Sequence, residues 1–167
     1  MCEPLPVEGP LPVEDVDRFW MGQALQRAHS AAAQDEVPIG ALVVRDGAII
    51  GSGWNATEHE QDAMAHAELV ALRQASRALG SRRLEDSVLY VTLEPCAMCA
   101  GAIVLARIQR LVFGAYDPKA GACGTLRNVV QDPRLNHTCL VTGGVLHNEC
   151  ADLLQSFFSG LRGRRPK

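Results

Sequence analysis

Residues 87–107 read SVLYVTLEPCAMCAGAIVLAR and contain a junction between a strand and a helix. The first seven residues, SVLYVTL, are strongly β-prone and predict a short buried strand. Pro95 follows shortly after, and proline is favoured in the first turn of a helix because its fixed φ suits that position. The segment CAMCAGAIVLAR then predicts the helix itself. A strand that leads directly into a helix indicates an α/β protein.

Two strong local signals lie upstream of this junction. VPIGALVVRDGAIIGSGW, residues 37–54, predicts a β-hairpin, because Asp46 and Gly47 form a typical two-residue turn between two β-prone runs. AHAELVALRQASRAL, residues 65–79, has the apolar spacing of a helix and is followed by Gly80, a frequent helix terminator.

The remaining segments complete an alternating pattern. Apolar residues recur at helical spacing over residues 15–34, behind a possible Asp15 cap. Residues 110–115 predict a buried strand, residues 139–144 a weaker one, and residues 148–161 a last helix. Because helices alternate with strands, we expect a three-layer α/β/α sandwich around a mixed five-stranded sheet.

Length and composition indicate one domain of ordinary globular character. The chain has 167 residues, of which 47% are hydrophobic and 21% charged. No apolar run approaches the roughly 18 residues of a membrane span, and the N-terminus lacks the pattern of a secretory signal. We therefore expect a cytoplasmic protein without a membrane segment. In a reducing compartment, close cysteines indicate metal or redox chemistry more often than disulfides.

The two ends of the chain differ from the domain between them. Residues 1–15 are acidic and proline-rich and predict a disordered extension. The folded domain is expected over residues 16–160. Residues 161–167 form a basic tail, which either follows phosphates or is simply solvated.

Cys96 and Cys99 are the first candidate site residues. Taken alone, a Cys-x-x-Cys pair is compatible with a redox couple, a structural zinc site, a catalytic metal site or two buried hydrophobic residues. The pair lies where a predicted strand meets a helix, and free backbone N–H groups there favour thiolates. His66, at the start of another predicted helix, would make three ligands, the number found in catalytic zinc sites that keep one position open.

Glu68 supplies the group that would make such a metal catalytic. It lies two residues after His66, and a proton shuttle needs a carboxylate beside the metal that is not itself a ligand. A thioredoxin-like couple would explain neither residue. A closed structural site would need a fourth ligand, for which Cys123 is the plausible donor, whereas Cys139 and Cys150 are expected in the core.

The sequence resembles a known family. HAE at 66–68 with PCAMC at 95–99 matches the established signature of zinc-dependent nucleobase deaminases. Longer segments resemble the tRNA-specific adenosine deaminases, and this resemblance covers roughly residues 16–162. The segments are EVPIGALVV (36–44), GSGWN (51–55), TLEPCAMCAGAI (92–103) and RLVFGAYDPKAGACGT (110–125).

The resemblance implies a homodimeric enzyme that converts the wobble adenosine of a tRNA anticodon stem-loop to inosine. In bacteria the usual substrate is the arginine tRNA with an ACG anticodon. His66, Cys96 and Cys99 would hold one Zn²⁺ per subunit, and Glu68 would donate and accept protons while an activated water attacks C6 of the adenine. The base must leave its stack to reach the metal, which an anticodon loop allows at low cost.

The same resemblance implies a set of RNA contacts. Asn55 would hydrogen-bond the purine, and the backbone N–H of Ala67 would face it. Asp117 would lie near a neighbouring ribose, and Tyr116, which stands where many relatives have arginine, would offer a stacking surface. Further expected contacts are Asn136, His137, Arg162, Arg164 and Arg165.

Two other functions remain open at this point. A deaminase of free guanine, cytosine or a nucleoside would share the zinc residues, and the loop within residues 110–125 and the basic C-terminus distinguish it from a tRNA enzyme. A non-catalytic zinc module that binds RNA or a partner would have no use for Glu68 beside the metal.

Overall fold

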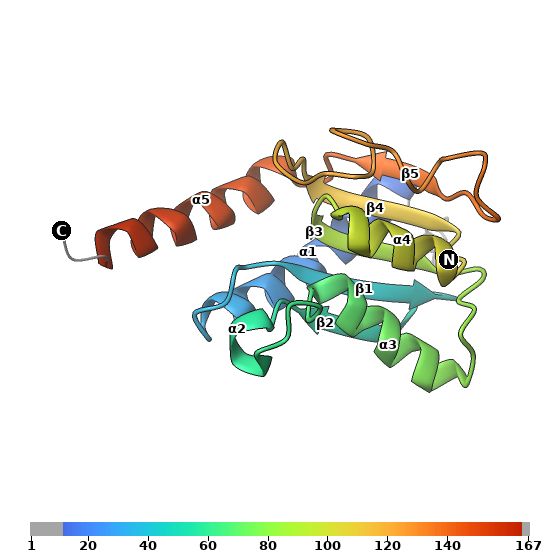
Figure 1. Cartoon of the computed structure of the whole chain (residues 1–167), viewed down its shortest axis with the longest axis horizontal. Helices are drawn as coiled ribbons and strands as arrows, with labels where there is room; N and C mark the ends of the chain where they lie inside the picture. The colour runs from blue at the N-terminus through green and yellow to red at the C-terminus, as the bar shows by residue number, and fades with distance from the viewer. Residues whose placement is uncertain (1–11, 165–167) are drawn as a thin grey trace, which may run out of the picture.

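The computed structural model describes residues 12–164, so most of the predicted N-terminal extension and the last three residues lie outside the described part (Figure 1). The elements, in chain order, are α1 (Val13–Ala32), β1 (Gly40–Arg45), β2 (Ala48–Trp54), α2 (Thr57–Glu60), α3 (Ala67–Leu79), β3 (Val88–Leu93), α4 (Ala97–Leu105), β4 (Arg110–Ala115), β5 (Leu140–Gly143) and α5 (His147–Arg164).

The five strands form one mixed sheet, as predicted. Their order is β2-β1-β3-β4-β5. β1 pairs antiparallel with both β2 and β3, whereas β3, β4 and β5 run parallel to one another. The carboxyl ends of the three parallel strands therefore lie along one edge of the sheet, the edge at which α/β proteins usually bind ligands.

Helices cover both faces of the sheet and bury two separate cores (Figure 1). Neighbouring strand residues point to opposite faces: Leu42 packs with Met21 of α1, while Val43 packs with α3 and α4. Cys139 and Cys150 are 3% and 1% exposed, one in each core, as expected. The predicted three-layer α/β/α sandwich is confirmed.

The turn and cap signals read from the sequence are confirmed. Asp46 and Gly47 have φ values of 51° and 73°, the left-handed pair that a two-residue type I′ hairpin needs. Gly80 ends α3 with φ 61°, a conformation that glycine adopts without steric cost.

Helix boundaries differ from prediction at both ends of the chain. α1 begins at Val13 after Pro12, so Asp15 is not the cap and instead lies in the first turn, where the helix dipole favours a carboxylate. α5 continues to Arg164 rather than ending at Leu161. Residues 161–164 therefore belong to a helix and not to a separate tail.

A buried ionic network ties α1 to the sheet. Asp17, 3% exposed, accepts two hydrogen bonds from Arg110 at 2.9 and 2.6 Å and one from the hydroxyl of Tyr90 at 3.0 Å. Arg110 also donates to Thr142 on β5 at 2.9 Å. The Asp17 carboxylate and the Arg110 guanidinium together join α1, β3, β4 and β5. None of the helices in the described part is long and apolar enough to cross a membrane.

Candidate active site

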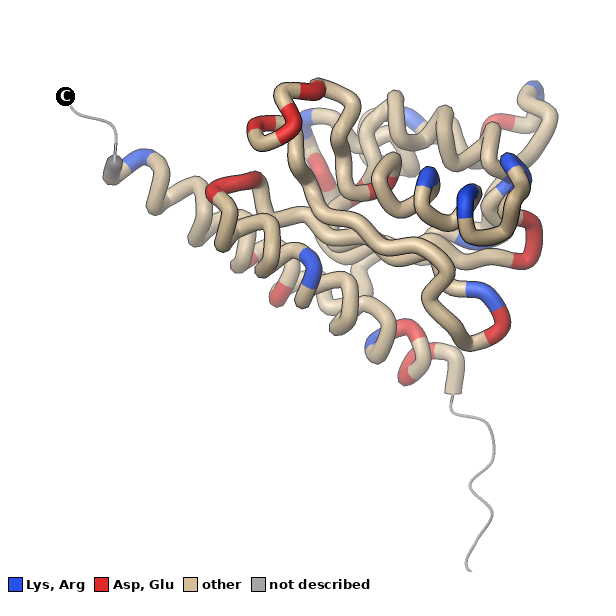
Figure 2. Tube along the Cα trace, turned by 90° about the horizontal axis from the view of Figure 1, so that it is seen from below, with Lys and Arg blue, Asp and Glu red and all other residues tan. Residues whose placement is uncertain are grey.

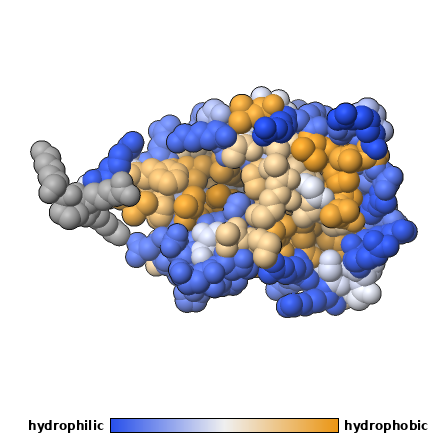
Figure 3. Space-filling view, in the orientation of Figure 1, coloured by the Kyte–Doolittle hydropathy of each residue, from blue (hydrophilic) through white to orange (hydrophobic). Residues whose placement is uncertain are grey.

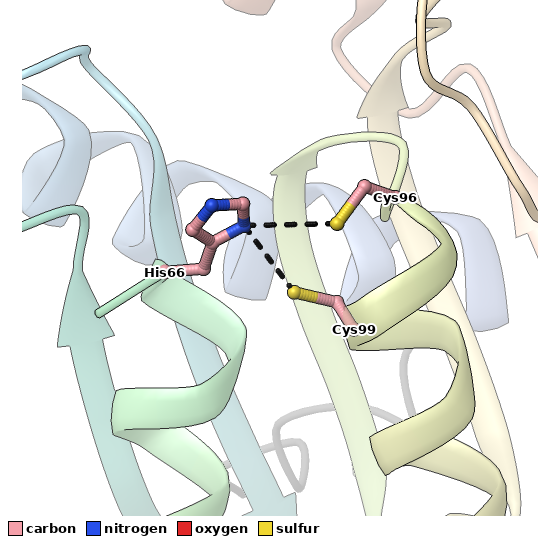
Figure 4. A group of neighbouring side chains, drawn as sticks. All are labelled: His66, Cys96 and Cys99. Carbon is pink, nitrogen blue, oxygen red and sulfur yellow. Dashed lines mark hydrogen bonds between the residues drawn. The ribbon is translucent and has the colours of Figure 1, made fainter. Parts of the chain in front are cut away.

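Three of the predicted site residues meet where two helices begin. His66 immediately precedes α3 and Cys96 immediately precedes α4, while Cys99 lies in the first turn of α4. Figure 4 shows the imidazole of His66 pointing across the gap between the two helices toward both sulfurs. The N-terminal ends of the helices place free N–H groups and positive dipole ends around these side chains, which favours thiolates.

The spacing of these atoms fits a tetrahedral metal ion. Nδ1 of His66 lies 3.7 Å from Sγ of Cys96 and 3.5 Å from Sγ of Cys99, and the three ligand atoms lie within 4.8 Å of one another. For a tetrahedral zinc with Zn–N of about 2.0–2.1 Å and Zn–S of about 2.3 Å, the nitrogen and each sulfur stand about 3.6 Å apart. The residues present therefore fit zinc and the softer divalent ions that prefer nitrogen and sulfur.

The two thiols are electrostatically unequal. Hydrogen bonds from Cys99 and from His66 lower the pKa of the Cys96 thiol to about 3. Cys99 is the donor in that pair and is buried, so its own pKa is raised. The pKa of His66 is raised, chiefly by its hydrogen bond to Cys96. A divalent cation among these atoms would stabilise both thiolates and leave the imidazole neutral.

Glu68 lies beside the cluster without belonging to it. It is in the first turn of α3 and 4% exposed, and its carboxyl group hydrogen-bonds the side chain of Cys99. Burial, the largest influence, raises its pKa. A carboxyl group whose pKa is raised holds a proton more readily than an exposed one, which suits a group that must accept and return a proton.

Cys123 does not close the site. Its buried thiol contacts the carbonyl oxygen of Pro95 at 3.8 Å, and within residues 12–164 the cluster consists of His66, Cys96 and Cys99 alone. Three protein ligands leave one tetrahedral position for water or substrate, the pattern of a catalytic rather than a structural zinc site.

Asn55 lies beside the cluster and is held by a residue that the sequence did not reveal. It follows β2, and the next residue, Ala56, donates its N–H to the carbonyl of Ala65, directly before His66. The amide nitrogen of Asn55 lies 3.4 Å from Oε2 of Glu36, a carboxylate only 1% exposed. Glu36 therefore fixes which end of the Asn55 amide faces the site.

Ala67 is the first residue of α3 and is fully buried. Backbone N–H groups in the first turn of a helix have no partner within that helix. The N–H of Ala67 is therefore free of a helical partner directly after His66, and its contact with the purine stays a prediction.

Tyr116 and Asp117 follow β4 at the same edge of the sheet. Leu93 at the end of β3 pairs with Ala115 at the end of β4, so the residues that follow the two strands begin next to each other. Tyr116 is 50% exposed, and its ring packs edge-on against Phe113 with the ring centroids 5.1 Å apart. The exposed part of the ring is a rigid surface on which an unpaired base can stack.

Asn136 and His137 lie away from the cluster, at the other end of β4, and their expected contact with RNA stays a prediction. Arg107 donates to the carbonyl of Asn136, and Nε2 of His137 lies 2.6 Å from the carbonyl of Ile108. Both partners precede β4, whereas the cluster follows β3. The physical reason is topological: β5 runs parallel to β4, so the chain must return to the opposite edge before β5 begins.

Arg162 and Arg164 lie at the end of α5, which projects away from the sheet (Figure 1). Arg162 is exposed and donates to Ser159 at 3.3 Å. Figure 2 shows positive charge on α5 only toward its C-terminal end. The side chain of Arg164 and all of Arg165 lie outside the described part of the chain.

Comparisons with known proteins agree with this site. A family model described as MafB19-like deaminase matches residues 16–162. An α/β/α fold with an open His/Cys/Cys centre and a buried glutamate is what such a deaminase requires, and this chain belongs to the MafB19-like deaminase family.

Curated relatives narrow the assignment. The tRNA-specific adenosine deaminase of Bacillus subtilis is 49% identical over 149 residues, which cover 89% of this chain and 92% of the relative. The tRNA-specific adenosine deaminase of Haemophilus influenzae is 48% identical over 149 residues, 89% of this chain and 86% of its own length. Within the family, the chain is therefore one of the tRNA-specific adenosine deaminases.

Solved structures give the same picture. A chain from a study of A-to-I editing by tRNA:A34 deaminases at the wobble position is 46% identical, with a TM-score of 0.78 over 81% of this chain and 99% of its own. A guanine deaminase from Nitrosomonas europaea has a TM-score of 0.76 over 95% and 98% of the two chains, but its 23% identity shows the shared fold alone.

Proposed function

We propose that this protein hydrolyses adenosine 34 in the anticodon loop of a tRNA, giving inosine and ammonia. The observation that carries the chemistry is the open group of His66, Cys96 and Cys99 with the buried Glu68 beside it. The choice of a tRNA base rests on the 46–49% identity to tRNA deaminases over most of the chain.

Zinc is the ion we propose for the centre, and when bound it supplies a Lewis acid that lowers the pKa of water to about 7. His66, Cys96 and Cys99 would hold it. Glu68 takes a proton from the attacking water and delivers it to the leaving nitrogen on C6 of the adenine. Its burial prevents bulk water from competing for that proton.

The chain's own residues also position the base. Asn55, which Glu36 orients, and the N–H of Ala67 at the start of α3 would offer hydrogen-bonding groups to the purine. Because these groups are fixed before the base arrives, little entropy is lost in ordering them.

The RNA around the flipped base meets the β4 edge and α5. The half-exposed ring of Tyr116 would stack on an unpaired nucleotide, and Asp117 would contact its ribose. Arg162, Arg164 and Arg165 would contact phosphates, which strengthens binding without reading sequence.

The arginine tRNA with an ACG anticodon is the substrate we propose within this class. The test is to incubate the purified protein with an ACG anticodon stem-loop and, separately, with a GCG stem-loop, guanine, cytosine and adenosine. Inosine in the ACG stem-loop alone supports the proposal. Deamination of a free base without activity on the stem-loop would overturn it.

We further propose a homodimer that works in the cytoplasm. Leu105 on α4 is 76% exposed and lies beside Leu69 and Ala102 in a shallow groove between α3 and α4. Figure 3 shows apolar side chains gathered on this face. An exposed apolar patch of this kind is typical of a protein interface.

Light scattering tests the dimer. Leu105→Asp is expected to lower the measured mass toward 18.0 kDa, because a carboxylate cannot be buried unpaired in an apolar interface. The exposed loop residue Leu135 provides a matched control, and Leu135→Asp is expected to leave the mass unchanged. An unchanged mass for Leu105→Asp would exclude this face.

A further inference from the structure

Glu94 is a buried carboxylate that the mechanism above does not use. It is 2% exposed and lies between the end of β3 and Pro95, two residues before Cys96. Its backbone N–H donates to the carbonyl of Ala115 at 2.8 Å, which joins the ends of β3 and β4. A buried carboxylate needs full hydrogen bonding to be tolerated.

All four hydrogen bonds to the Glu94 carboxylate come from one loop, residues 116–125. Oε1 accepts the backbone N–H groups of Cys123 and Thr125 at 3.1 and 3.0 Å. Oε2 accepts the N–H of Asp117 at 3.1 Å and the hydroxyl of Thr125. The donors lie at both ends of the loop, so a single side chain fixes its beginning and its end.

The contact between this loop and the segment before the cysteines is reinforced by the backbone. The carbonyl oxygen of Pro95 accepts the N–H of Ala122 at 2.9 Å and lies 3.8 Å from the thiol of Cys123. Residues 94 and 95 therefore bind the loop through one side chain and one carbonyl. The loop is attached directly to the segment that carries Cys96.

Gly121 shows how closely the loop approaches the carboxylate. A Cβ atom at this position would lie 2.5 Å from Oε2 of Glu94 and 2.6 Å from the carbonyl oxygen of Asp117. Any side chain there would push the two apart. Glycine is required because the backbone passes against Glu94, and this explains one glycine of the GACG sequence.

We infer that Glu94 is a positioning residue that holds the RNA-facing loop, with Tyr116 and Asp117 at its start, against the metal-binding segment at Cys96. The inference rests on the proposed function, because the loop matters only if RNA binds there. Glu94 would thus help to place the tRNA loop over the metal site, although it contacts neither the RNA nor the metal.

Glu94→Gln disturbs one end of the loop selectively. The glutamine oxygen can still accept the N–H groups of Cys123 and Thr125, and its NH₂ group can donate to the Thr125 hydroxyl. Its NH₂ group then faces the N–H of Asp117, a donor opposed to a donor. The Asp117 end of the loop therefore loses its anchor while the rest of the contacts survive.

We expect Glu94→Gln to raise the KM for the ACG stem-loop by about tenfold or more, the cost of one lost charge-assisted hydrogen bond. The turnover number should change less than the KM, and bound zinc should remain at one per chain. Thr125→Val is also expected to raise the KM, whereas Thr125→Ser keeps the hydroxyl and should have the KM of the wild type. Glu85→Gln, at an exposed glutamate, is the matched control and should have no effect.

Hydrogen exchange gives a readout that does not depend on the substrate. In Glu94→Gln the amide of Asp117 should exchange faster than in the wild type, and in Glu85→Gln it should not. Unchanged exchange and unchanged KM in both Glu94→Gln and Thr125→Val would overturn the inference, as would loss of zinc with an unchanged KM. If the wild type failed on the stem-loop while exchange still responded, the proposed function would fail and the loop anchor would stand.

Discussion

Replacing Glu36 by glutamine tests how the base-contacting asparagine is oriented. Oε1 of Glu36 accepts the backbone N–H of His59 at 2.6 Å, and Oε2 faces the amide nitrogen of Asn55 at 3.4 Å. A glutamine keeps its oxygen toward His59, because that bond is the shorter, and turns its NH₂ group toward Asn55. Two NH₂ groups then face each other, and Asn55 relieves the conflict by turning its amide over.

In the wild type Nδ2 of Asn55 is turned to Glu36 and Oδ1 is left for the purine, so the inverted amide offers the purine a donor in place of an acceptor. A mismatched pair of buried polar groups costs about 1–3 kcal/mol, which is about 5- to 150-fold in kcat/KM. The fold should lose only about 1 kcal/mol, because the hydrogen bond to His59 survives. The variant therefore separates the orientation of Asn55 from general stability.

The assay is kcat/KM on the ACG stem-loop together with the midpoint of urea unfolding. Glu60→Gln serves as the control, because Glu60 is exposed and lies in α2 next to His59, the residue whose N–H Glu36 accepts. A Glu36→Gln enzyme with wild-type kcat/KM and a wild-type unfolding midpoint would refute the reasoning, since Glu36 would then not set the orientation of Asn55.

Three further outcomes are expected. Removing the metal with a chelator should abolish inosine formation, and added Zn²⁺ should restore it. The His66→Ala variant should bind less zinc and stay inactive when Zn²⁺ is added. Full activity after metal removal would contradict a catalytic metal at His66, Cys96 and Cys99. Asp17→Ala should lower the free energy of unfolding in urea by about 3 kcal/mol, because it leaves Arg110 without its buried counter-charge, while the exposed Asp15→Ala changes it by less than about 0.5 kcal/mol. Burial raises the pKa of the Cys150 thiol to about 12, whereas the same thiol in the unfolded chain has a pKa of about 8.5 and loses its proton first. The contribution of this thiol to the free energy of unfolding should therefore be constant below about pH 8.5 and fall as the pH rises toward about 12. A free energy of unfolding that does not change over this range would be evidence against the burial of Cys150.

Features that depend on neighbouring residues in the chain could be predicted from the sequence. Asp46 and Gly47 define their own turn, and Gly80 ends its own helix, because both act through local backbone conformation. The metal site was also predictable, since His66 and Cys96 each begin a helix after a strand or loop on the same edge of an α/β sheet.

Features that depend on the direction of distant strands were not predictable. Asn136 and His137 lie at the opposite edge because β5 is parallel to β4, and a short strand of weak pattern carries no sign of its direction. The two glutamates that hold the site, Glu36 and Glu94, were missed because glutamate is almost never fully buried unless it is paired. Their donors come from segments remote in sequence, at His59 and Thr125.

The central claim is that Glu68 transfers the proton from water to the leaving nitrogen, and inosine formation by Glu68→Gln tests it most directly. The glutamine keeps the size of the buried side chain but cannot carry a proton between water and the leaving nitrogen. We expect one zinc per chain, unchanged stem-loop binding and a loss of about 10²- to 10⁴-fold in turnover. Wild-type turnover in a zinc-loaded Glu68→Gln enzyme would contradict the account.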